Sequence, residues 1–335
     1  MEASEQETLE RLRQLRDELR LRRAMQAELA ALEDELCTSN RFFPRTNILS
    51  WVDAIAPMVT RTLPSGSTLY RARIVAKAQE DRFFAPVYHA LEDALGAFAR
   101  DGERGLDNES FAEAYLQLEI ERLESGLPMP DFDVFKRKLA PFQEKGWWGF
   151  GQDESDAAPS DVTGSGRINP KGISYLYASS RKGTAALEAR PVISQMVSIA
   201  EVVLCEEVTL FDLTRNVFAD DESASEETRM FRKILAHYFS KPNYSGDSAY
   251  LVTQYISEYV KGRIETSTGL RFDGISFSSS LDRKGTNYVV FDTSERRKYQ
   301  IVASSIERVT DMRGTLSTSL PMDDAAIRAL MNGSL

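Results

Sequence analysis

The chain has 335 residues, of which 42% are hydrophobic and 27% are charged, a balance typical of a folded protein with a sizeable core. Its length favours about two domains. Because 51 acidic residues outnumber 41 basic ones and the formal net charge is −10, we expect no nucleic-acid partner. The first residues are not typical of a signal peptide and no apolar run is long enough for a bilayer, so we expect a cytoplasmic protein without a membrane partner.

Residues for metal or nucleophile chemistry are scarce. The chain has two histidines, His89 and His237, and two cysteines, Cys37 and Cys205. A zinc site needs several such ligands on converging elements, and a Ser-His-Asp or Cys-His arrangement needs a base beside its nucleophile. We therefore expect no metal site and no disulfide framework. Any catalysis has to come from carboxylates, hydroxyls and guanidinium groups.

Residues 1–45 are predicted to form a charged N-terminal helix or arm. Leu12, Leu15 and Leu19 follow helical spacing, and an apolar pattern from Met25 to Leu36 resumes it in a shifted phase. Too few unbroken heptads are present for a sustained coiled coil. The helix is therefore expected either to pack on its own domain or to bind a partner or a second copy.

Residues 46–165 are predicted to be mainly helical, with one core strand and a long insert. Helical patterns cover 48–62 and 82–145, while residues 67–76 (STLYRARIVA) alternate like a half-buried strand. Residues 146–166 are rich in Gly, Ser, Asp and Pro and are expected to form a long irregular loop, a kind of segment that is often functional. A lid over a binding cleft is one role such a loop could have.

From residue 166 the pattern changes to strands mixed with helices. Strands are expected over 173–178, 193–204, 208–213, 272–277, 287–291 and 299–309, and helices from Thr184 and over 225–239 and 250–261. We interpret residues 166–310 as a catalytic domain. Residues 311–335 are interpreted as a polar tail with one short helix over 324–331.

Four short segments carry residues suited to carboxylate, hydroxyl and guanidinium chemistry. They are residues 69–73 (LYRAR), 166–172 (GRINPKG) with the strand that follows, 184–191 (TAALEARP), and 272–280 (FDGISFSSS) with 285–287 (GTN) behind it. Each segment alone has an ordinary structural explanation: an ion-paired arginine, a turn, a solvated glutamate or a strand end.

In this order and spacing the four segments resemble the RES domain, a family named for its Arg, Glu and Ser. Members carry an LYR-like strand, then GRxNPxGxxYLY, TAxxEvR and DGIxxxSS followed by an Asn, and the match covers residues 67–75 and 166–309. The resemblance implies an α+β fold with a split β core like that of ADP-ribosyltransferase toxins, here preceded and interrupted by a largely helical segment. It also implies a bacterial toxin that cleaves the nicotinamide–ribose bond of NAD, by phosphorolysis or by hydrolysis.

The resemblance assigns four catalytic residues. The family arginine, glutamate and tyrosine match Arg71, Glu188 and Tyr177, and the serine is best matched by Ser279 within the run 278–280. Cleavage at the ribose passes through an oxocarbenium-like state. Glu188 would stabilise the positive charge of that state, and the Arg71 guanidinium would bind the pyrophosphate through two parallel hydrogen bonds. Tyr177 would stack on nicotinamide, and Ser279 would hydrogen-bond the sugar or the amide.

Further residues are candidates for binding NAD or phosphate. Arg73 is an alternative to Arg71 because the two lie on the same face of a strand. Arg167 or Arg190 would neutralise an attacking phosphate. The candidate binding residues are Arg73, Arg167, Asn169, Arg190 and Asn287.

The expected ligands are NAD as substrate and inorganic phosphate as a co-substrate, with no further cofactor. By resemblance, an antitoxin or immunity protein is an expected partner, and the N-terminal helix could join two copies into a homo-oligomer. Two alternatives to an NAD-degrading toxin stay open. One is an ADP-ribosyltransferase that modifies a macromolecule, and the other is an inactive RES-like protein that works through its N-terminal helix.

Overall fold

The structure is a computed structural model. It describes residues 2–80, 82–83, 148–214, 224–241, 250–264, 271–291 and 297–310, together with residues 120, 123–124, 126, 137, 140, 146, 269 and 293. Most of the helical pattern predicted over 82–145, and the tail with its short helix over 324–331, lie outside these residues. None of the helices described is both long enough and apolar enough to cross a bilayer.

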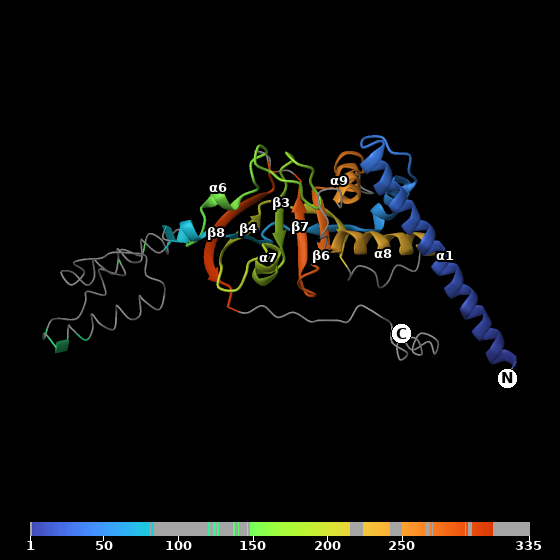
Figure 1. The fold of residues 1–335 in the computed structure, drawn as a ribbon, viewed down its shortest axis with the longest axis horizontal. Coiled ribbons are helices and arrows are strands. Elements are labelled where there is room, and N and C mark those ends of the chain that lie inside the picture. The colour runs from blue at the N-terminus through green and yellow to red at the C-terminus, as the bar shows by residue number, and fades with distance from the viewer. Residues whose placement is uncertain are drawn as a thin grey trace.

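One eight-stranded mixed sheet forms the centre of the fold (Figure 1). Its strands lie in the order β1-β5-β6-β7-β3-β2-β4-β8, and all neighbours are antiparallel except β5 and β6. The strands are β1 (Thr60–Leu63), β2 (Thr68–Ile74), β3 (Leu176–Ser179), β4 (Met196–Leu204), β5 (Val208–Leu213), β6 (Gly274–Ser278), β7 (Thr286–Val290) and β8 (Tyr299–Arg308). The predicted α+β class is confirmed, and strands from both sides of residue 166 share the sheet.

The sheet is split between two neighbouring interior strands, β2 and β3. Strand β2 pairs with β4 over its whole length, from Thr68 to Ile74, but it pairs with β3 only at Tyr70, opposite Ser179. The sheet therefore consists of two halves, β1-β5-β6-β7-β3 and β2-β4-β8. This is the split β core that the sequence predicted. Arg71 bridges the split, since its Nη1 donates to the carbonyl oxygen of Tyr177 at 2.9 Å.

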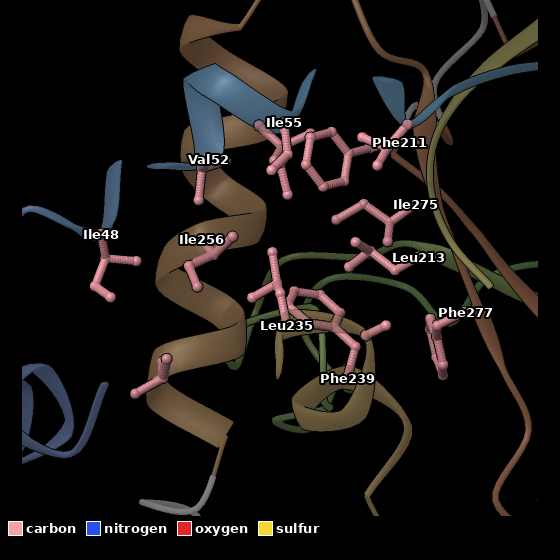
Figure 2. Packing of buried hydrophobic residues seen from close by; sticks show 14 of the residues in the cluster. Ile48, Val52, Ile55, Phe211, Leu213, Leu235, Phe239, Ile256, Ile275 and Phe277 are labelled. Atoms are coloured by element: carbon pink, nitrogen blue, oxygen red, sulfur yellow. The ribbon is translucent and has the colours of Figure 1, made fainter. Parts of the chain in front are cut away.

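A layer of helices covers one face of the β5–β6 region. It consists of α1 (Glu2–Thr38), α2 (Ile48–Ile55), α8 (Glu226–Ser240) and α9 (Leu251–Arg263). Figure 2 shows apolar side chains of α2, α8 and α9 meeting those of the sheet; the labelled residues are Ile48, Val52, Ile55, Phe211, Leu213, Leu235, Phe239, Ile256, Ile275 and Phe277. Each fully buried side chain of this size contributes about 1.5–3 kcal/mol to folding. The packing fixes α8 and α9 firmly against the sheet.

Helix α1 confirms the predicted long N-terminal helix. Its second half packs on α8 and α9 through four buried side chains, Met25, Leu29, Leu32 and Leu36. Its first half extends away from the rest of the molecule (Figure 1). The interpretation of α1 as a helix packed on its own domain therefore holds for the second half only.

The structure corrects several predicted boundaries. The helix predicted over 48–62 ends at Ile55, because Pro57 lies in the short 3-10 turn η1 (Ala56–Met58) and cannot donate to a continuing helix. The chain then forms β1, a strand that the alternation did not reveal because only its last residue, Leu63, is buried. The predicted loop over 146–166 contains one helical turn, α6 (Gln152–Ser155).

Candidate active site

A pocket of about 380 Å³ opens where β2 and β3 separate, within the usual range of about 300–1,000 Å³ for small-molecule sites. Strands β2 and β3, the loop before β3 and the end of α7 (Lys182–Glu188) form most of its wall. The pocket brings together six residues predicted for the site: Arg71, Arg167, Tyr177, Glu188, Arg190 and Asn287. Its lining also includes residues that the sequence analysis had not selected, among them Tyr70, Ser179, Tyr250 and Phe277.

Glu188 is the last residue of α7, and its carboxylate is fixed on one side only. Oε1 accepts hydrogen bonds from Ser279 Oγ at 2.7 Å and from Asn287 Nδ2 at 2.6 Å. Oε2 has no hydrogen-bond partner among the described residues, and the side chain is exposed in the pocket. Two donors on one oxygen orient the carboxylate and leave the other oxygen available to a ligand.

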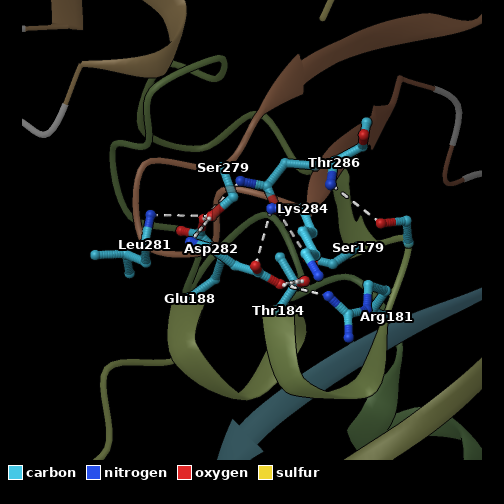
Figure 3. Close-up of polar contacts among 11 residues, drawn as sticks. Ser179, Arg181, Thr184, Glu188, Ser279, Leu281, Asp282, Lys284 and Thr286 are labelled. Atoms are coloured by element: carbon cyan, nitrogen blue, oxygen red, sulfur yellow. Dashed lines mark hydrogen bonds and ion pairs between the residues drawn. The ribbon is translucent and has the colours of Figure 1, made fainter. Parts of the chain in front are cut away.

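Ser279 lies behind Glu188 and not on the pocket wall. It is 1% exposed, and its hydroxyl accepts from the backbone N–H groups of Leu281 and Asp282 while donating to Glu188. A hydroxyl has one proton to donate. Ser279 therefore positions Glu188, whereas the sequence analysis expected it to contact the sugar or the amide. Of the serine run 278–280, Ser279 is the residue that reaches the carboxylate (Figure 3).

The turn after Ser279 is bound to the first turn of α7 through Asp282. The Asp282 carboxylate accepts from Thr184 Oγ1 at 2.6 Å and lies 3.4 Å from Arg181 Nη1 (Figure 3). Burial alone raises the pKa of Asp282, but the hydrogen bonds from Thr184 and Lys284 and the charge of Arg181 outweigh it and lower the pKa. These contacts hold the serine turn in register with the helix that carries Glu188.

Asn287 links Glu188 to strand β3. Its Nδ2 donates to Glu188, and its Oδ1 accepts from Ser179 Oγ at 2.8 Å. Asn287 on β7 lies opposite Ser179 on β3 in the sheet. The regular strand pairing thus sets the position of the amide that orients the carboxylate.

Arg71 provides a half-buried cation at the split. Its Nη1 is bound to Tyr177, but its Nε is buried without a hydrogen-bond partner. Burial, and then the nearby charge of Arg73, lower the pKa of Arg71 to about 10, so the group is still protonated near neutral pH. No carboxylate of the described chain forms an ion pair with it. A half-buried guanidinium without a counter-ion, on the wall of a pocket, favours an anionic ligand.

Two more arginines line the pocket. The Arg167 guanidinium donates to the carbonyl oxygen of Phe239 and lies over the rings of Tyr250 and Phe277, 5.7 Å and 5.5 Å from their centroids. Burial lowers the pKa of Arg167, and the charge of Glu188 is among the groups that oppose this. Arg190 is exposed and has a positive φ of 55°, a conformation that costs about 1 kcal/mol or more for a residue with a side chain.

Asn169 and Tyr177 hold the loop that carries Arg167 in place by hydrogen bonds from its buried side. The buried Asn169 Nδ2 lies 2.9–3.1 Å from three carbonyl oxygens of this loop, and its Oδ1 accepts from the Tyr177 hydroxyl at 2.7 Å. The Tyr177 hydroxyl in turn accepts from the N–H of Ile168. A Cβ on Gly166 would lie 2.3 Å from Asn169 Oδ1, so the position requires glycine. Asn169 thus holds the loop from behind, while the Tyr177 ring lines the pocket.

Helix α9 also holds this loop by hydrogen bonds, through two residues that the sequence analysis did not select. Thr253 Oγ1 donates to the carbonyl oxygen of Arg167 at 2.6 Å. Gln254 Nε2 lies within hydrogen-bond distance of Ser165 Oγ and of the carbonyl oxygens of Gly166 and Asn169. Both side chains are buried. In the sequence, the signal for these two contacts is the pair of adjacent polar residues, Thr253 and Gln254, within an amphipathic helix.

Arg73 and the loop over 148–150 lie away from the pocket. Arg73 Nη2 donates to the carbonyl oxygen of Asp156 at 2.6 Å, so Arg71 is the arginine of this strand that faces a ligand. The N–H groups of Gly149 and Phe150 donate to Ser304 and Ser198 of the β4–β8 pair. This part of the predicted loop is therefore packed against the sheet and does not cover the pocket.

Comparison with protein-family models assigns most of the pocket residues to a known domain. The family model for the RES domain matches residues 144–311, half of the chain, and the matched region includes every pocket residue except those on β2. Neither the curated proteins nor the solved structures gave a match. Because the family model covers half of the chain, including the Glu188 region of the pocket, the chain belongs to the RES domain family.

Proposed function

We propose that this protein cleaves the nicotinamide–ribose bond of NAD, with phosphate or water as the acceptor, and acts as a toxin or defence effector. RES domains are known generally as NAD-related, toxin-associated domains. The observation that carries the proposal is the Glu188 carboxylate, oriented by Ser279 and Asn287, in a pocket whose other charged lining residues are Arg71, Arg167 and Arg190.

Glu188 is proposed to stabilise the developing positive charge on the ribose. The C1″–N bond breaks with its electron pair leaving on nicotinamide, which becomes neutral, and the acceptor oxygen forms the new bond at C1″. Phosphate as acceptor gives ADP-ribose 1″-phosphate, and water gives ADP-ribose and a proton. A carboxylate with one oxygen fixed and the other available provides negative charge in a preset position, which is the arrangement that favours a cationic transition state.

The arginines are proposed to bind the anionic parts of the reactants. Arg71 lines the pocket, and its planar guanidinium suits two-pronged contact with the pyrophosphate. Arg167 and Arg190 lie on the same pocket and suit an attacking phosphate. The rings of Tyr177, Tyr250 and Phe277 provide apolar surface for nicotinamide and exclude water from the reacting carbon.

The test is incubation of the purified chain with NAD, with and without inorganic phosphate, followed by identification of the products by mass spectrometry. We expect free nicotinamide together with ADP-ribose 1″-phosphate, ADP-ribose or both. Glu188→Gln should abolish NAD loss, whereas Glu206→Gln, at an exposed glutamate outside the pocket, should not. The absence of NAD loss with the parent chain under both conditions refutes the proposal.

The same experiment separates the alternatives. Label from ADP-ribose-labelled NAD that stays on a macromolecule identifies an ADP-ribosyltransferase, because NAD degradation leaves label only in small products. An inactive RES-like protein would leave NAD intact. An antitoxin or immunity protein that blocks NAD loss is the partner that we propose for a toxin of this kind.

A further inference from the structure

The first half of helix α1 carries an exposed leucine stripe. Leu9, Leu12, Leu15 and Leu19 are 48%, 57%, 46% and 54% exposed. They lie on the part of α1 that extends away from the sheet and its helical layer (Figure 1). Four leucines exposed on one short helical segment form an unusual surface, which is typical of an interaction site.

The leucine stripe does not continue the buried face of the same helix. At about 100° per residue, Leu9 to Leu19 are centred roughly 125° around the helix from the buried residues Met25, Leu29, Leu32 and Leu36. The helix therefore presents one face to its own core and a different face to its surroundings. A partner on the leucine stripe does not compete with the packing of α1 on α8 and α9.

We propose that the leucine stripe binds the same stripe of a second copy, in an antiparallel two-helix coil over residues 2–25. The charge distribution along the helix indicates that the partner is a second copy of this chain. Residues 1–10 have four acidic and no basic side chains, whereas residues 11–23 have six arginines and two acidic residues. In an antiparallel pair the acidic end of each helix lies against the basic part of the other, over about 36 Å.

One alignment satisfies both the two central leucines, Leu12 and Leu15, and the flanking charges. Placing Leu12 opposite the partner's Leu15, and Leu15 opposite the partner's Leu12, centres the pair on the exposed segment. On one side of this seam Arg11 then lies near the partner's Glu18, two residues from level, and by symmetry Glu18 lies near the partner's Arg11. Such flanking charge pairs are what sets helix orientation in coiled coils.

A parallel pair with the same leucines is disfavoured by charge. There Arg11 would lie beside the partner's Arg16, and the two copies of Arg22 would meet at a seam position. The pattern therefore distinguishes the two orientations, and it also makes the surface complementary to itself. Because the leucine seam is short, the dimer is expected to dissociate on dilution.

The first test is the mass of the full chain by light scattering or sedimentation over a range of concentrations. We expect the parent to approach twice 37.7 kDa as concentration rises and Leu12→Glu/Leu15→Glu to stay at 37.7 kDa. Both side chains are about half exposed, so the double variant should keep its fold, which circular dichroism checks. Val162→Glu, at a more exposed apolar residue elsewhere, is the matched control and should dimerise like the parent.

The second test is a charge reversal that reports orientation. Arg11→Glu and Glu18→Arg should each weaken the antiparallel dimer, by on the order of tenfold in Kd, and the double variant should restore it. In a parallel dimer Arg11→Glu would instead relieve the clash with Arg16 and strengthen association. A parent that is monomeric throughout, a dimer that survives Leu12→Glu/Leu15→Glu, or a dimer that Arg11→Glu strengthens each overturns the proposal.

Discussion

Replacement of Ser279 by alanine tests whether this residue acts through Glu188 or on the ligand. The hydroxyl donates to the Glu188 carboxylate and accepts from two backbone N–H groups, and the side chain is buried. Loss of a hydrogen bond to a charged group costs about 1.5–3 kcal/mol, and each orphaned N–H adds about 1 kcal/mol unless water reaches it. With both N–H groups left without a partner, we therefore expect Ser279→Ala to lower the free energy of unfolding by about 3.5–5 kcal/mol.

The effect on turnover should be confined to kcat. Without Ser279 the carboxylate loses one of its two donors and samples other orientations, and a displacement on the order of 1 Å costs about 100-fold in rate. KM for NAD should change little because Ser279 does not line the pocket. Urea denaturation and steady-state kinetics, by release of nicotinamide, measure the two effects.

Ser280→Ala is the matched control, since the Ser280 side chain makes no hydrogen bond with a described residue and is expected to leave stability and turnover unchanged. An Ser279→Ala variant with a raised KM and an unchanged kcat would mean that the hydroxyl contacts the ligand. Unchanged stability and unchanged kcat together would refute the positioning role.

Three further predictions concern the pocket and its supports. Arg71→Lys keeps the charge but loses the planar fork, so KM for NAD should rise about tenfold or more, whereas Arg73→Lys should leave KM unchanged; equal effects would contradict the assignment of Arg71. Gln254→Leu removes the side-chain donor to the Gly166 carbonyl and one of two donors to the Asn169 carbonyl, and should cost about 1–3 kcal/mol of stability and lower kcat/KM; Gln254→Glu should be worse because it places an acceptor against acceptors. Because folding lowers the pKa of Asp282, the ionised carboxylate stabilises the folded protein at pH values above the ordinary aspartate pKa of about 3.9. This stabilisation is lost as the pH falls through the lowered pKa. Urea denaturation of Asp282→Asn should therefore show a loss relative to the parent at pH 7 that shrinks at pH values below the lowered pKa, and a loss independent of pH would contradict this.

Elements with a clear periodicity were predictable from the sequence. Strand β5 has the predicted bounds, because all six of its residues are apolar or buried, and α8 begins after Ser225, whose side chain caps it by accepting from Thr228 N–H. Strand β1 was not predictable, because three of its four residues are exposed and its position depends on pairing with β5.

The candidate site was predictable where a side chain belongs to a compact motif. Arg71, Glu188 and Asn287 are far apart in the sequence, and only the order of their motifs indicated that they meet. The supports from α9 were not predictable in the same way. Thr253 and Gln254 bind backbone carbonyl oxygens, and a backbone acceptor leaves no pattern in the sequence of the loop. The difference between Arg71 and Arg73 likewise depends on which neighbour each meets, not on their spacing.

Because β2 and β3 pair at one position only, each of these interior strands resembles an edge strand along the split. Along the split, residues of β2 and β3 line a pocket in place of a continuous strand pairing, and strand edges of this kind offer main-chain groups for hydrogen bonding. Recognition through the main chain persists when side chains change. Alanine substitutions along these strands are therefore expected to understate how much the strands contribute to binding.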